Sequence, residues 1–165
     1  MRVGVISDTH SYFDDRIAHH LKTVDLIVHA GDVGDVSVLH NLRSIQETKC
    51  VYGNIDGSEV RAQCPEHLFF TLNQVRFLVI HIAGSVGRYN ATTRALIKKN
   101  SPDVLICGHS HILKVVNDPT HNLLHLNPGA AGRHGFHKVR TLLKFEVAEK
   151  NINNLKVIEL GPRST

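Results

Sequence analysis

The sequence predicts an α/β protein of one domain, and three observations carry that prediction. The length of 165 residues is typical of a single domain with its own buried core. Hydrophobic residues make up 42% of the chain and charged residues 21%, values that exclude disordered, collagen-like and coiled-coil classes. Strand-like runs alternate with helical patterns early and follow one another late, an order that indicates βαβ units and then an antiparallel addition.

The predicted strands are short runs rich in Val, Ile and Leu. The early strands are expected at 2–7, 25–30, 49–52, 67–72, 75–80 and 103–107. The later runs, which are typical of hairpin strands, lie at 112–117, 122–126, 140–147 and 152–160. The spacing of apolar residues predicts helices at 13–22, 35–45 and 89–99. Asp35 and Asn90 are the predicted N-caps of the second and third helices.

Charge, hydropathy and cysteine usage limit the partners and the compartment. The net charge is +4, but the basic residues are scattered with few aromatic residues among them, so we expect a solvated surface and no nucleic-acid partner. No apolar run approaches the roughly 20 residues of a membrane helix, and we expect neither export nor a membrane partner. The three cysteines, Cys50, Cys64 and Cys107, have no spacing pattern and are expected to be buried free thiols in a reducing cytoplasm.

Polar side chains follow five of the predicted strands where each strand ends. These residues are Asp8, His10, Asp32, Asn54, His81, His109 and His111. Each taken alone could be a turn former, a helix cap or a hydrogen-bonded histidine. Because the carboxyl ends of strands in an open α/β sheet converge on one crevice, their repetition predicts a single assembled site. Oxygen and nitrogen donors without cysteine suit Mn, Fe, Zn, Co, Ni or Mg.

The order of these motifs resembles the calcineurin-like metallophosphoesterase superfamily. The motifs are DTH at 8–10, GD at 31–32, GN at 53–54, His81, and GHSH at 108–111. The short length, YGNID at 52–56 and NPGA at 127–130 look like its small prokaryotic phosphodiesterase branch, which shares its fold with a eukaryotic retromer subunit. The resemblance implies one domain over residues 1–165, an α/β four-layer αββα sandwich of two mixed β-sheets flanked by helices.

The resemblance also implies a centre of two divalent metal ions, Mn²⁺ first, with Ni²⁺, Co²⁺, Fe²⁺ or Zn²⁺ as alternatives. Asp8, His10 and His111 would hold one ion, Asn54, His81 and His109 the other, and Asp32 would bridge both. Such a pair can share a bridging hydroxide and clamp phosphoryl oxygens for in-line attack. The implied activity is a metal-dependent phosphodiesterase acting on a small phosphoester or nucleotide. The alternative is a catalytically weak protein-binding scaffold, which the filled motif positions disfavour.

The chain departs from the family pattern at three places. Ile55 stands where many members have a histidine that can protonate the leaving group, so diesters or good leaving groups become the expected substrates. The run from His81 to Gly84 replaces a histidine-glycine-histidine triplet, and Ala130 replaces a serine. Arg133 and His134 are candidate substrate-binding residues, with a polar loop as the alternative. The natural substrate and a homo-oligomeric state stay open.

Overall fold

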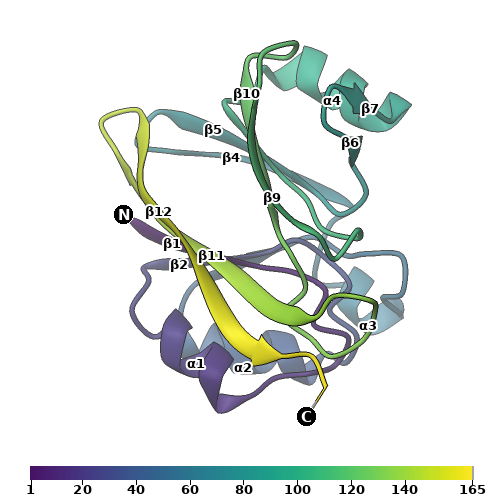
Figure 1. The fold of residues 1–165 in the computed structure, drawn as a ribbon. Coiled ribbons are helices and arrows are strands. Elements are labelled where there is room, and N and C mark those ends of the chain that lie inside the picture. The colour runs from purple at the N-terminus through teal and green to yellow at the C-terminus, as the bar shows by residue number, and fades with distance from the viewer. Residues whose placement is uncertain (165) are drawn as a thin grey trace.

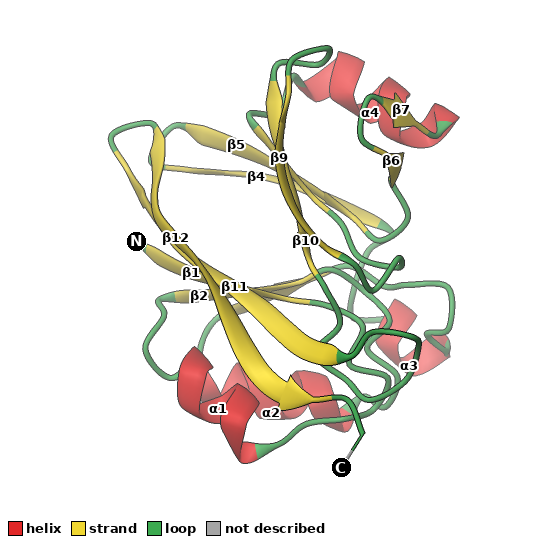
Figure 2. Cartoon of the chain, in the orientation of Figure 1, coloured by secondary structure: helices red, strands yellow, loops and turns green. Residues whose placement is uncertain are grey.

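The structure, a computed structural model, describes residues 1–164 and consists of two five-stranded sheets with helices outside them (Figures 1 and 2). The first sheet has the order β12-β11-β1-β2-β3. Its strands are β1 (Arg2–Ile6), β2 (Leu26–His29), β3 (Thr48–Cys50), β11 (Val139–Ala148) and β12 (Asn151–Pro162). The first three are parallel, and β11 and β12 pair antiparallel beyond β1.

The second sheet has the order β4-β5-β8-β10-β9, with a parallel centre and antiparallel edges. Its strands are β4 (His67–Leu72), β5 (Val75–Ile80), β8 (Val104–Ile106), β9 (Leu113–Asp118) and β10 (Leu123–Pro128). A small hairpin of β6 (Gly84–Ser85) and β7 (Arg88–Tyr89) precedes the last helix. Every predicted strand is therefore present, and the expected α/β sandwich of two mixed sheets is confirmed.

Helices lie on the outer faces of the two sheets, as Figure 1 shows. They are α1 (Asp15–Leu21), α2 (Ser37–Ile45), α3 (Ser58–Arg61) and α4 (Ala91–Asn100). The predicted cap Asn90 accepts a hydrogen bond from the Thr93 N–H, whereas Asp35 lies one residue before the N-cap of α2. No helix in the part of the chain that the structure describes is both long and apolar enough to cross a membrane.

The alternation of side chains along β1 explains how the layers are joined. Val3 and Val5 pack into the core between the two sheets, where the rings of Phe77 and Phe145 lie stacked at 6.2 Å. Ile6 points the other way, into the core beneath α1 and α2. Gly4 also lies on the helix side, where a Cβ atom would collide with Leu21 of α1. Because successive side chains point to opposite faces, apolar residues at consecutive positions bury both faces of β1.

The cysteine prediction is wrong for two of the three residues. Cys50 and Cys64 form a disulfide between the end of β3 and the turn after α3, and only Cys107 is a buried free thiol. The chain between them returns so that their Cα atoms lie 5.4 Å apart, which the irregular spacing in the sequence does not reveal. The expectation of a reducing compartment, which rested on three free thiols, loses that support.

Candidate metal centre

The seven predicted ligands come together at one end of the two sheets. They lie in the loops after β1, β2, β3 and β8 and directly after β5, at strand ends that converge beside α3 in Figure 1. Their ligand atoms form two groups, each with atoms within 4.8 Å of one another: Asp8, His10, Asp32 and His111 in one, and Asp32, His81 and His109 in the other. Asn54 joins the second group, since its Oδ1 lies 3.0 Å from His109 Nδ1.

Asp32 belongs to both groups, and its two carboxylate oxygens point to different partners. Oδ2 lies 3.6 Å from His10 Nε2, whereas Oδ1 lies 3.2 Å from His81 Nε2. In the first group, His111 Nε2 lies 3.2 Å from Asp8 Oδ1 and 3.3 Å from His10 Nε2. Two imidazole nitrogens this close, beside carboxylates, are the donor arrangement that a divalent metal requires.

His81 provides a test of whether these residues fit a metal. Its side chain is buried, and Nδ1 lies 2.7 Å from the Ala30 carbonyl, to which it must donate its proton. In the neutral ring Nε2 is then unprotonated, and it has no hydrogen-bond partner among residues 1–164. A ring held by a backbone carbonyl, with its free nitrogen facing carboxylates, is the usual form of a metal-ligating histidine. The residues present therefore fit a metal ion.

Left-handed backbone recurs among the same residues. Five of the seven have a left-handed backbone, namely Asp8 (φ 54°), His10 (46°), Asp32 (53°), His109 (67°) and His111 (58°). This conformation is costly for residues with a Cβ and persists at functional sites where the surrounding structure enforces it. Gly53 allows the neighbouring loop to approach, because a Cβ there would collide with Asp32. The loops are thus bent so that the side chains converge.

The charges of the centre shift the pKa values of its histidines in different directions. Burial would lower the pKa of His81, but the carboxylates of Asp32 and Asp8 outweigh it and raise that pKa. A hydrogen bond to Asp8 raises the pKa of His111. Burial lowers the pKa of His10. The two buried carboxylates therefore dominate the field, which favours a bound cation.

Asp56 supports the centre and was missed in the sequence. It is 4% exposed, and its carboxylate accepts hydrogen bonds from the backbone N–H groups of Val33 (3.2 Å), Gly34 (2.7 Å) and Gly53 (2.7 Å). These bonds tie the loop that carries Asp32 to the loop that carries Asn54. An aspartate two residues after Asn54, at a turn, was the available signal, because aspartates in turns accept bonds from nearby backbone N–H groups.

The two candidate substrate-binding residues lie in different surroundings. The His134 ring lies 4.7 Å from the His10 ring and lines the cavity at the metal centre. The guanidinium of Arg133 instead lies 4.6 Å from the centre of the Tyr12 ring. The structure therefore brings His134, and not Arg133, to the lining of this cavity.

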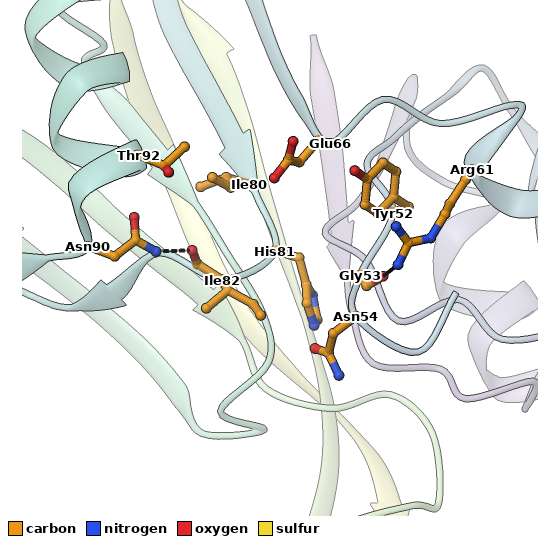
Figure 3. Close-up of a pocket in the computed structure, with 10 residues that line it drawn as sticks. All are labelled: Tyr52, Gly53, Asn54, Arg61, Glu66, Ile80, His81, Ile82, Asn90 and Thr92. Atoms are coloured by element: carbon orange, nitrogen blue, oxygen red, sulfur yellow. Dashed lines mark hydrogen bonds between the residues drawn. The ribbon is translucent and has the colours of Figure 1, made fainter. Parts of the chain in front are cut away.

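Two of the cavities beside the centre share Asn54. The first, about 560 Å³, is lined by His10, Asp32 and Asn54 among others and is called the metal cavity below. The second, about 390 Å³, lies on the His81 side. Figure 3 shows Tyr52 and Arg61 on one side of this second cavity, Asn90 and Ile82 on the other, and His81 and Asn54 at one end. A ligand at the metal centre would therefore have space in two directions.

The fold and the site define an α/β protein with residues that could ligate a metal at converging strand ends, and comparison with known proteins assigns its family. A model of the calcineurin-like phosphoesterase superfamily domain matches residues 1–150, and the chain belongs to this family. A probable metallophosphoesterase of Methanocaldococcus jannaschii is 34% identical over 136 residues, 79% of this chain and 68% of that protein. A phosphodiesterase of the same organism is 23% identical over 145 residues, 78% of this chain and 83% of that protein.

Solved structures agree with the fold. Zinc-bound Vps29 from Entamoeba histolytica is 17% identical, with a TM-score of 0.73 over 98% of this chain and all of that chain. An archaeal phosphodiesterase is 20% identical, with a TM-score of 0.72 over 96% of this chain and 99% of the other. Family membership makes the chain a metal-dependent phosphoesterase, a hydrolase of phosphoester bonds.

Proposed function

We propose that the protein is a phosphodiesterase with a dinuclear metal centre, and that Mn²⁺ is its first-choice metal. The observation that carries the proposal is Asp32, which directs one carboxylate oxygen toward each ligand group. Asp8, His10 and His111 would hold one ion, and Asn54, His81 and His109 the other. When bound, two such ions supply an activated water and Lewis-acid stabilisation of the phosphoryl oxygens.

The residues of the chain itself set the geometry for that chemistry. The Ala30 carbonyl fixes the His81 tautomer, so that Nε2 faces Asp32. The Asp8 carboxylate accepts a hydrogen bond from the His109 backbone N–H at 3.1 Å, which holds the loop after β8 against the loop after β1. Asp56 holds the two remaining loops together. The candidate ligands are therefore held in position before the substrate binds, so they do not have to reorganise during the reaction.

Two features favour diesters over monoesters as substrates. The metal cavity and the second cavity share Asn54, so each of the two ester groups of a phosphodiester would have its own space. Ile55 offers no proton to a leaving oxygen, which penalises alkyl leaving groups most. The scaffold alternative is supported only by the likeness in fold to Vps29. Scaffold versions of the fold can tolerate lost ligands, whereas this chain fills every motif position.

The test compares two substrates on one preparation. The protein is stripped of metal, reloaded with Mn²⁺ and assayed with an aryl phosphodiester and an alkyl phosphomonoester. We expect a higher kcat/KM for the diester and loss of both activities after chelation. A preference for the alkyl monoester, or activity that survives chelation, would contradict the proposal.

A further inference from the structure

Three large apolar side chains are exposed at the rim of the metal cavity. They are Ile55 at 46%, Ile112 at 62% and Phe136 at 103% relative exposure, and we call them the apolar rim. All three line the same cavity as His10 and His109. Scattered exposed apolar residues are common, but three at the opening of one cavity form a patch of the kind that marks a binding site.

Folding does not account for the position of Phe136. The backbone of its loop is held on both sides, because the His137 ring donates to the Gly132 carbonyl and the Arg163 side chain donates to the His137 carbonyl, both at 3.0 Å. The Phe136 side chain itself is fully exposed. The loop is thus anchored while its aromatic ring stays unpacked, which leaves the ring free to contact a ligand.

The other two members of the rim are adjacent to predicted ligands. Ile55 follows Asn54, and its backbone N–H donates to Asp32 Oδ1 at 3.2 Å. Ile112 follows His111, and its backbone N–H donates to Ser110 Oγ at 3.3 Å. A group that contacts them would therefore be attached close to the phosphoryl group held at the metal centre.

We infer that the apolar rim binds an aromatic ester group of the substrate, with Phe136 as its main contact. The inference rests on the proposed function and names the substrate class for it. Apolar and aromatic side chains stabilise planar rings by burial and by stacking. The cavity of about 560 Å³ lies within the size range of small-molecule sites. An aryl group and a nucleobase share this chemistry.

The test measures ligand binding rather than turnover. Dissociation constants of phenyl phosphate, methyl phosphate and a nucleoside 5′-monophosphate are determined calorimetrically on the Mn²⁺-loaded protein. We expect phenyl phosphate to bind more tightly than methyl phosphate, and Phe136→Ala to weaken phenyl phosphate about 3- to 10-fold with methyl phosphate unchanged. If Phe136→Ala weakens binding of the nucleotide as much as binding of phenyl phosphate, the rim also binds a nucleobase, which would support the inference.

Phe69→Ala is the matched control. Phe69 lies on β4, is 38% exposed and is not among the residues that line the metal cavity, so this variant should bind all three ligands as the parent does. Two results would overturn the inference. One is similar dissociation constants for phenyl and methyl phosphate in the parent, and the other is an equal loss of affinity for both ligands in Phe136→Ala. Light scattering adds a further outcome: a changed oligomeric state with unchanged binding would make the rim a protein interface and also overturn it. Diester hydrolysis, measured separately, would still stand in each case.

Discussion

The candidate metal centre and a second cluster of histidines differ in their hydrogen bonding. The second cluster lies around His125 and consists of Tyr89, Cys107, Asp118, His121 and His125. Both ring nitrogens of His125 have partners, the Tyr89 hydroxyl at 3.2 Å and Cys107 Sγ at 3.5 Å, and His121 pairs with Asp118 at 2.8 Å. At the metal centre, by contrast, the buried Nε2 of His81 has no hydrogen-bond partner in the described residues.

The backbone conformation also distinguishes the two clusters. Five of the seven metal-centre residues have positive φ, whereas the five residues around His125 do not. The residue types are similar, yet one cluster is satisfied within the protein and the other is strained and incomplete. An unpartnered buried imidazole nitrogen beside carboxylates, together with left-handed backbone at most of its residues, distinguishes the candidate metal centre, whereas His125 has hydrogen-bond partners within the protein.

The largest effect is expected for Asp32→Ala. This substitution removes the carboxylate that both ligand groups share, and we expect kcat/KM for an aryl phosphodiester to fall at least about 1000-fold, roughly 4 kcal/mol of transition-state stabilisation. Steady-state kinetics at saturating Mn²⁺ measures it.

Asn54→Ala is the comparison for that variant. It removes one neutral ligand from one group only, so its loss should be smaller, about 10- to 100-fold. Equal losses for the two variants at saturating metal would show that Asp32 does not bridge.

Ile55→His adds a titratable side chain to the metal cavity. A histidine there could donate a proton to the departing oxygen, and general acid catalysis is typically worth about 10²–10⁴ in rate. We expect kcat/KM for an alkyl phosphomonoester to rise up to about 100-fold. The aryl diester should show no such rise, because its leaving group needs little protonation and the substitution removes one apolar side chain of the rim. If the parent already hydrolyses the alkyl monoester faster than the diester, another acid is present, and His134 is the first residue to substitute.

His125→Leu should affect stability and not metal binding. The substitution removes the partner that His125 provides to the Tyr89 hydroxyl and to Cys107, at a cost of about 1–3 kcal/mol in the free energy of unfolding at pH 7. Urea unfolding followed by circular dichroism measures this loss. Metal content that drops along with stability would show that the two clusters are not independent.

The loss of stability in His125→Leu should depend on pH. Burial lowers the pKa of His125 to about 4, whereas an unfolded histidine titrates near 6.5. As pH falls from about 6.5 to about 4, the unfolded state gains a proton that the folded state does not, so the parent loses up to about 3 kcal/mol from this residue. His125→Leu lacks that loss, and its stability deficit should shrink toward pH 4. A deficit that stays constant with pH would contradict the structural role.

Most of the fold could be predicted from the sequence because its signals are local. All ten strands of the two five-stranded sheets and helices α1, α2 and α4 follow from apolar periodicity and turn residues. The convergence of the seven candidate ligands was predictable for a related reason: each lies in the segment that follows a strand, and parallel strands bring their carboxyl ends to one edge. The four-residue helix α3 and the short β6–β7 hairpin are too short to leave a periodic pattern.

The remaining features depend on contacts between distant segments. The disulfide joins Cys50 to Cys64 only because the chain returns past α3, and Asp56 accepts hydrogen bonds from Val33 and Gly34, which lie in a different loop. Arg133 and His134 are neighbours in sequence, yet their side chains lie against Tyr12 and His10 respectively. Such placements follow from tertiary packing and cannot be read from a single chain segment.

Metal stoichiometry tests the central claim most directly. The chain is purified, stripped with a chelator, saturated with Mn²⁺, freed of excess metal and measured by elemental analysis against protein concentration. The two ligand groups that share Asp32 predict two ions per chain and recovery of phosphoesterase activity with the metal. A content that stays at zero or one ion per chain under saturating Mn²⁺ would contradict the dinuclear centre.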